Sequence, residues 1–157
     1  ATAHKPTCCC KSMRSISVTS HFVFVPGKPV AKARPRVTMR GGKPRAYTPK
    51  KTADFEAMIR DHWRGFPIME GPLHLSIVCY LEIPQSWSKK KKTQAEHGEI
   101  EPTSRPDIDN YAKLVMDALN GIAYNDDSQV VRMIISKMYS ERPGILISLQ
   151  SSIPRNT

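Results

Sequence analysis

Residues 73–83, LHLSIVCYLEI, form the most regular stretch of this 157-residue chain. Apolar side chains fall on every second position and polar ones fill the positions between, with Val78 as the exception. The apolar face consists of Leu73, Leu75, Ile77, Cys79, Leu81 and Ile83. A period of two residues over this length predicts a β-strand with one face packed against helices. We expect this strand to be central in its sheet.

The residues before this strand predict a first strand and a basic hairpin. Residues 16–25, ISVTSHFVFV, are rich in β-branched and aromatic side chains, and Pro26–Gly27 ends them. A short strand around Arg36–Arg40 and another that ends at Tyr47 flank a Gly41–Gly42 turn. The two short strands are expected to form an exposed hairpin whose cations meet a polyanion.

Two helices are predicted from their caps and apolar spacing. Thr48 is expected to be the N-cap of the first, with Pro49 at the first helical position. Its packing face is Phe55, Met58, Ile59 and His62. The second helix is expected over about Asp107–Asn120, with Gly121 as its left-handed cap. Its buried stripe is Tyr111, Leu114, Val115, Ala118, Leu119 and Ile122.

Three further segments complete the prediction. Residues 84–104 have no apolar rhythm and are expected to be a solvated loop that carries the lysine run 89–92. Residues 129–139 and 144–150 predict two strands, which we expect to pair as a hairpin. The fold class is therefore α+β (mixed α/β), a small mixed sheet with two main helices packed on one face. One domain is expected over residues 16–150, with a disordered tail at 1–15 and a C-terminal tail at 151–157.

The charge of the chain is strongly positive and unevenly distributed. The formal net charge is +10, and residues 1–51 contain twelve Lys or Arg and no Asp or Glu. Such a block indicates a nucleic-acid partner, although a solvated basic surface is the plainer alternative. The DNA-binding candidates in the hairpin region are Lys32, Arg34, Arg36, Arg40, Lys43 and Arg45, and those in the loop are Lys89 and Lys90.

Several functional classes are disfavoured by the sequence. No apolar run approaches the ~20 residues that a membrane span needs, and no signal peptide is recognisable. The four cysteines lack zinc-site spacing, and nothing in their pattern demands a disulfide. We therefore expect a cytoplasmic protein without a membrane partner, with Cys79 as a small core residue.

Two short acidic segments contrast with the basic chain. Asp107 and Asp109 stand at the start of the second predicted helix, and Asp126 and Asp127 precede a strand. A structural explanation is available, because carboxylates cap helix starts and Asp109, Lys113 and Asp117 could form a surface ion-pair ladder. However, the short turn between that helix and the next strand suggests that both pairs lie at one end of the sheet. Hard oxygen ligands gathered there would select Mg²⁺ or Mn²⁺.

The run RPDIDNYAKLVMDALNGIAYNDDSQV at residues 105–130 resembles the signature of the RusA family of Holliday junction resolvases. GKPVAKARPRV, followed by a YTP helix start, also resembles this family. The match covers roughly residues 22–149. The combination of motifs is specific, whereas a lone D-x-D would not be.

The resemblance implies a homodimeric Mg²⁺-dependent endonuclease, with Mn²⁺ as a substitute, that cuts four-way DNA junctions in recombination and repair. It implies no small-molecule cofactor. The catalytic residues it implies are Asp107, Asp109, Lys113 and Asp127, and the metal ligands are Asp107, Asp109 and Asp127, with Asp126 as an alternative ligand. Pro106 occupies a position where the family often has a basic residue, so Arg105 is expected to supply that cation. The setting is the cytoplasm of a bacterial or phage-infected cell.

Two other functions are compatible with these residues. One is a non-catalytic protein that binds branched DNA and uses its aspartates only as helix caps. The other is a broader flap or branched-DNA nuclease. Dependence of cutting on Mg²⁺ separates the first from an enzyme, and a panel of DNA structures separates the second from a junction resolvase.

Overall fold

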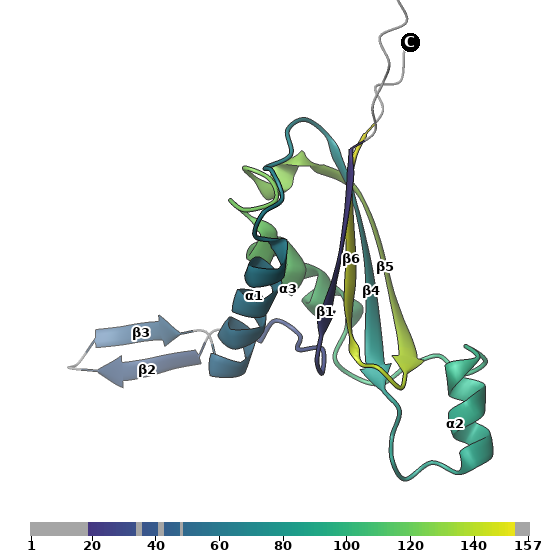
Figure 1. Ribbon diagram of the computed structural model, residues 1–157. Helices are drawn as coiled ribbons and strands as arrows, with labels where there is room; N and C mark the ends of the chain where they lie inside the picture. The colour runs from purple at the N-terminus through teal and green to yellow at the C-terminus, as the bar shows by residue number, and fades with distance from the viewer. Residues whose placement is uncertain (1–18, 34–35, 41–42, 48, 153–157) are drawn as a thin grey trace, which may run out of the picture.

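The computed structural model describes residues 19–33, 36–40, 43–47 and 49–152, with side chains described outside the hairpin (Figure 1). The strands are β1 Ser20–Pro26, β2 Arg36–Arg40, β3 Lys43–Tyr47, β4 Leu73–Glu82, β5 Val130–Ser140 and β6 Gly144–Ser151. The helices are α1 Lys50–Trp63, α2 Lys89–Glu96 and α3 Ile108–Leu119, followed by a 3₁₀ turn, η1, at Asp127–Gln129. The predicted tails 1–15 and 151–157 lie largely outside the described residues, although Ser151 belongs to β6.

The main sheet has the strand order β1-β6-β4-β5. Strand β4 is interior, as its alternating pattern predicts, and pairs antiparallel with β6 and parallel with β5. The predicted hairpin between the last two strands is wrong, because β4 lies between them. A parallel pair needs a crossover connection of a dozen or more residues, and the long segment that contains α2 and α3 provides it.

Helices α1 and α3 pack on one face of this sheet (Figure 1), which confirms the predicted fold class. Ile59 and Trp63 of α1 and Leu114 of α3 are fully buried against the sheet residues Ile77 and Ile147. Burial of such apolar side chains contributes about 25 cal/mol per Å² and is the main force that holds the layers together. Helix α1 begins at Lys50 with Pro49 as its N-cap, one residue later than predicted, and Thr48 lies outside the described residues.

Helix α2 replaces part of the loop predicted for residues 84–104. The side chain of Ser88 accepts a hydrogen bond from the backbone N–H of Lys91, which caps the helix start. Within α2 only Ala95 is buried, so the helix has no apolar stripe that a periodicity argument could detect. The lysine run therefore lies on a short ordered helix beside β5.

Two features outside the core bear on function. The β2–β3 hairpin extends away from the sheet and helices (Figure 1). The sheet face opposite α1 and α3 carries exposed apolar side chains on its two edge strands, namely Phe22, Phe24, Ile134 and Met138.

Among the described residues, no helix combines the length and apolar character needed to cross a bilayer.

Candidate active site

The first acidic pair, Asp107 and Asp109, stands at the start of α3. Asp107 is the N-cap by position, but among the described residues its carboxylate accepts no capping hydrogen bond. Both carboxylates are exposed near the positive end of the helix dipole. Capping alone therefore does not explain Asp107, whose oxygens remain available for an external cation.

Lys113 contacts this pair from one helical turn further on. Its Nζ donates a hydrogen bond to Oδ2 of Asp109 at 3.1 Å. This bond holds the pKa of the Asp109 carboxyl below its ordinary value, against the opposing effect of desolvation. The two side chains are both exposed, so the pair contributes little to stability and leaves a point charge beside the carboxylate.

Lys137 is a second cation at this site, and sequence reasoning missed it. From β5 its Nζ donates to the carbonyl oxygens of Ser104 at 3.1 Å and Pro106 at 3.3 Å. These bonds fix the backbone directly before Asp107. The sequence offered no signal for Lys137, because its place on the helix-covered face depends on its parallel pairing with Cys79 of β4.

The second acidic pair, Asp126 and Asp127, lies in the turn before β5. Gln129 organises this turn: its Oε1 accepts from the backbone N–H groups of Asn125 and Asp126, and its Nε2 donates to the carbonyls of Met69 and Gly71. Ser128 donates its hydroxyl to Asp126, which lowers the pKa of that carboxyl. Both aspartates are exposed.

One chain does not bring the two acidic pairs together. Because β4 and β5 are parallel, the chain must return from the end of β4 to its start before β5 can begin, and α3 runs along this return path. The first pair stands before α3 and the second beyond it, and a twelve-residue helix is about 18 Å long. Across residues 19–33 and 49–152, no three His, Cys, Asp or Glu side chains lie close enough to hold a metal ion. The expectation that both pairs lie at one end of the sheet does not hold within a single chain.

Tyr124 marks the neighbourhood of the second pair. Its hydroxyl donates to the carbonyl of Met116 at 3.1 Å, which folds the turn after α3 back onto the helix. Burial, and then the charges of Asp127, Asp117 and Asp126, raise its pKa above the ordinary tyrosine value. The second pair thus shares its surroundings with Asp117, near the end of α3, and not with Asp107.

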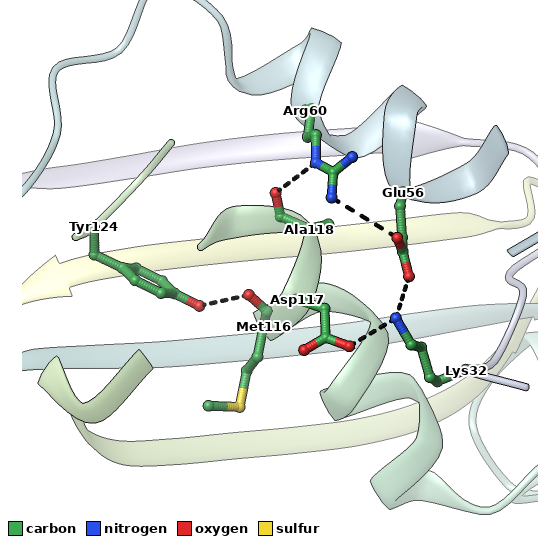
Figure 2. A network of polar contacts seen from close by, with 7 residues as sticks. All are labelled: Lys32, Glu56, Arg60, Met116, Asp117, Ala118 and Tyr124. Carbon is green, nitrogen blue, oxygen red and sulfur yellow. Dashed lines mark hydrogen bonds and ion pairs between the residues drawn. The ribbon is translucent and has the colours of Figure 1, made fainter. Parts of the chain in front are cut away.

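Lys32 joins three elements through ion pairs (Figure 2). Its Nζ lies 2.6 Å from Oε1 of Glu56 on α1 and 2.7 Å from Oδ2 of Asp117 on α3. Its backbone N–H also donates to the carbonyl of Asn110 in the first turn of α3. Lys32 was predicted to bind DNA, but the structure pairs its charge within the chain, where it attaches the root of the hairpin to α3.

The other predicted DNA-binding residues fall into three groups. Arg34 lies outside the described residues. Arg36 and Arg40 on β2 alternate with Val37 and Met39, and the register pairs Arg40 with Lys43 and Thr38 with Arg45. These basic positions therefore share one face of the two-stranded ribbon. Arg105 is exposed just before the first acidic pair, and Lys89 and Lys90 are exposed in the first turn of α2.

The chain matches known proteins over most of its length. The model of a family described as endodeoxyribonuclease RusA matches residues 26–150. A protein of Bacillus subtilis (strain 168), the uncharacterized protein YqaN, is 43% identical over 129 residues, which cover 79% of this chain and 91% of that protein. The family match includes both acidic pairs, Lys113 and the hairpin.

Proposed function

Because the chain belongs to the RusA family of endodeoxyribonucleases, which are nucleases that act on Holliday junctions, we propose that it is a homodimeric Mg²⁺-dependent resolvase. In this proposal it cuts four-way DNA by paired hydrolysis of phosphodiester bonds, and Mn²⁺ substitutes for Mg²⁺. One observation carries the proposal. Helix α3, to which Lys32 attaches the basic hairpin, bears the Asp109–Lys113 pair and begins at Asp107, whose exposed carboxylate makes no capping hydrogen bond.

The donor set fits a hard divalent cation. Asp107, Asp109 and either Asp127 or Asp126 offer only carboxylate oxygens, the ligands that Mg²⁺ prefers, and this set includes no thiolate or imidazole. When bound, such an ion would activate a water molecule and stabilise charge on the phosphate. Without a cation, carboxylates held next to a DNA backbone would repel it.

The residues of the chain have distinct roles in this reaction. Lys113 supplies a point charge beside Asp109 that orients the scissile phosphate and offsets the negative charge that develops on it. Lys137 keeps the backbone before Asp107 in place through Ser104 and Pro106. The basic face of the hairpin and the lysines of α2 bind the phosphates of the DNA arms.

A second copy of the chain completes the metal site in this proposal. The first and second acidic pairs lie at opposite ends of α3, and no third carboxylate joins Asp107 and Asp109 among the described residues, which supports a ligand from another chain. The uncovered sheet face, with Phe22 60% and Ile134 53% exposed, offers an apolar surface for association. A two-fold dimer would carry two equivalent sites, which suits a four-way junction of approximate two-fold symmetry.

Cutting assays on synthetic DNA test the function. We expect the protein to cut a four-way junction in Mg²⁺ or Mn²⁺, not in EDTA, and to cut flaps, forks and linear duplex much less. Binding of the junction without cutting in any divalent ion would instead favour the non-catalytic protein, and equal cutting of flaps would favour the broader nuclease.

An Asp109→Asn variant tests the site itself. We expect loss of cutting with junction binding kept or tightened, because a negative charge next to the DNA is removed. Asp61→Asn is the matched control, since Asp61 is exposed on α1 and pairs only with Arg64 among the described residues. Loss of binding and of the cooperative thermal transition in Asp109→Asn would count against a catalytic role.

A further inference from the structure

A large cavity opens beside the segment Ser104–Pro106, which leads into the first acidic pair. Its volume is about 990 Å³, at the upper end of the range for ligand pockets. The segment between β1 and β2, the first half of α1, the end of β4 and the loop before α3 form its walls. Arg105 and Pro106 line it, and Asp107 follows them in the chain. Whatever occupies the cavity therefore lies next to a proposed catalytic carboxylate.

The floor of the cavity is apolar and aromatic. Phe55 and Tyr111 are buried there, and Tyr139 lines the side formed by β5. Tyr139 also packs against Trp87 with ring centroids 5.1 Å apart, and Nζ of Lys91 lies 4.1 Å from the Trp87 ring. The partly exposed rings of Tyr139 and Trp87 can accept stacked nucleobases of any sequence, whereas Phe55 and Tyr111 contribute apolar lining. The aromatic surface thus runs from the cavity to the lysine helix α2.

The rim of the cavity carries charged, exposed side chains. Three are cations, Lys28, Lys51 and Arg105, and two are carboxylates, Asp54 and Glu82. Nζ of Lys28 lies 3.5 Å from Oε2 of Glu82, which offsets one of the negative charges. An apolar floor beneath a rim with an excess of cations is complementary to a nucleotide, whose base is flat and apolar-faced and whose phosphate is anionic.

We propose that this cavity receives an unstacked nucleotide from the branch point of the DNA. The inference rests on the proposed function and explains how the enzyme selects branched DNA. Taking a base out of a continuous duplex breaks stacking and pairing, whereas a base at a branch point has already lost part of both. A base stacked on the partly exposed ring of Tyr139 would lie in the cavity that Arg105 also lines, two residues before Asp107 in the chain. Linear duplex would fill the cavity only after disrupting a base pair.

Met58 provides the variant that tests the cavity. It lines the cavity from α1 and is 36% exposed, so a larger side chain there fills the space without entering the core. Met58→Trp is the filling variant, and Met58→Glu is a second one that places a negative charge at the mouth. Ile68→Trp is the control, because Ile68 is 48% exposed and lies beyond the other end of α1. Matching thermal transitions identify the variants that are folded.

Binding is measured in EDTA, where no cutting occurs, with two four-way junctions that differ only by abasic nucleotides at the branch point. The wild-type protein and Ile68→Trp are expected to bind the intact junction roughly tenfold more tightly than the abasic one. Both Met58 variants are expected to bind the two junctions with equal, weaker affinity. A wild-type protein that does not discriminate, or a folded Met58→Trp that still does, would overturn the proposal.

The cutting assay keeps the two proposals separable. If the junction is cut in Mg²⁺ but the abasic substitution has no effect on binding, the nuclease stands and the nucleotide cavity falls. If the abasic substitution weakens binding but no divalent ion supports cutting, the cavity stands and the nuclease falls.

Discussion

Nζ of Lys32 lies 2.6 Å from Oε1 of Glu56, a residue of α1 that is only 7% exposed. The same ammonium lies 2.7 Å from Asp117 on α3, and Arg60 reaches Glu56 from the other side at 3.8 Å. A buried carboxylate is costly unless it is paired and hydrogen-bonded. Lys32 therefore joins the start of the hairpin, α1 and α3 into one unit, and this arrangement couples the proposed DNA-binding arm to the proposed catalytic helix.

Lys32→Met should destabilise the protein by about 2–3 kcal/mol, because it leaves the buried carboxylate of Glu56 with only a long contact to Arg60 among the residues whose side chains are described. Urea unfolding followed by circular dichroism measures the change. The double variant Lys32→Met, Glu56→Gln should recover part of the loss, since the uncompensated charge is removed. A single variant as stable as the wild type would show that the ion pair is immaterial.

The contribution of Lys32 to stability should disappear at high pH. Burial alone would lower the pKa of its ammonium, but the hydrogen bonds to Asp117 and Glu56 outweigh this effect and raise the pKa above its ordinary value. A raised pKa in the folded state adds stability that is fully present below the unfolded value of about 10.4 and is lost as the pH rises through the folded value.

The measurement is the difference in unfolding free energy between wild type and Lys32→Met, taken from about pH 8 to pH 12. We expect a constant difference up to about pH 10 and a decline above it. Lys32→Arg should show no such decline, because the guanidinium keeps its charge. A difference independent of pH would mean that packing, and not charge, is responsible.

Lys137→Met should reduce kcat on the order of tenfold and leave KM for the junction nearly unchanged, because a small displacement of Asp107 affects the reaction more than binding. Cutting rates measured over a range of junction concentrations give kcat and KM separately. Lys137→Arg should restore part of the rate by donating to the same carbonyls. Arg132→Met is the control, since Arg132 lies on the same strand but on the uncovered face. Equal losses in both Met variants would argue against a positioning role.

Mixing two inactive variants should restore activity if two chains share each site. In a heterodimer of Asp109→Asn and Asp127→Asn, one site would contain both substitutions and the other would contain neither. Refolding equal amounts of the two variants together should therefore leave roughly a quarter of all sites intact. Nicking of a labelled junction measures this recovery.

Activity that stays absent in the mixture, with heterodimers demonstrated by affinity tags, would mean that each chain builds its own site. Mixing Asp107→Asn with Asp109→Asn serves as the negative control, because both substitutions lie in the same acidic pair and every site then contains one of them.

The elements that bury an apolar face could be predicted from the sequence. The alternation in β4 and the stripe of α3 each point to the core, and the structure confirms both. Helix α2 was missed because it buries only Ala95 and depends on the Ser88 cap. The pairing of β5 was wrong because a hairpin signal is local, whereas the parallel pairing of β4 and β5 spans more than fifty residues.

The candidate site likewise has parts that the sequence predicts and parts that it does not. The Asp109–Lys113 contact follows from their i, i+4 spacing and was predictable. Lys32 was assigned to DNA because its charge was counted without its partners, and Glu56 received no role although it follows Phe55 on the buried side of α1. The separation of the acidic pairs depends on the direction of α3 relative to the sheet, which spacing along the sequence does not specify.

Strand β6 lies between β1 and β4, so the sheet joins nearly the whole length of the chain: Ser20 pairs with Gln150. During synthesis on the ribosome, β1 emerges long before its partner and cannot be paired until β6 has been made. Three core residues, Ile145, Ile147 and Leu149, arrive with that late strand. Contacts of such large sequence separation slow folding, so the nascent chain should expose the apolar faces of β1 and β4 until β6 has been synthesised.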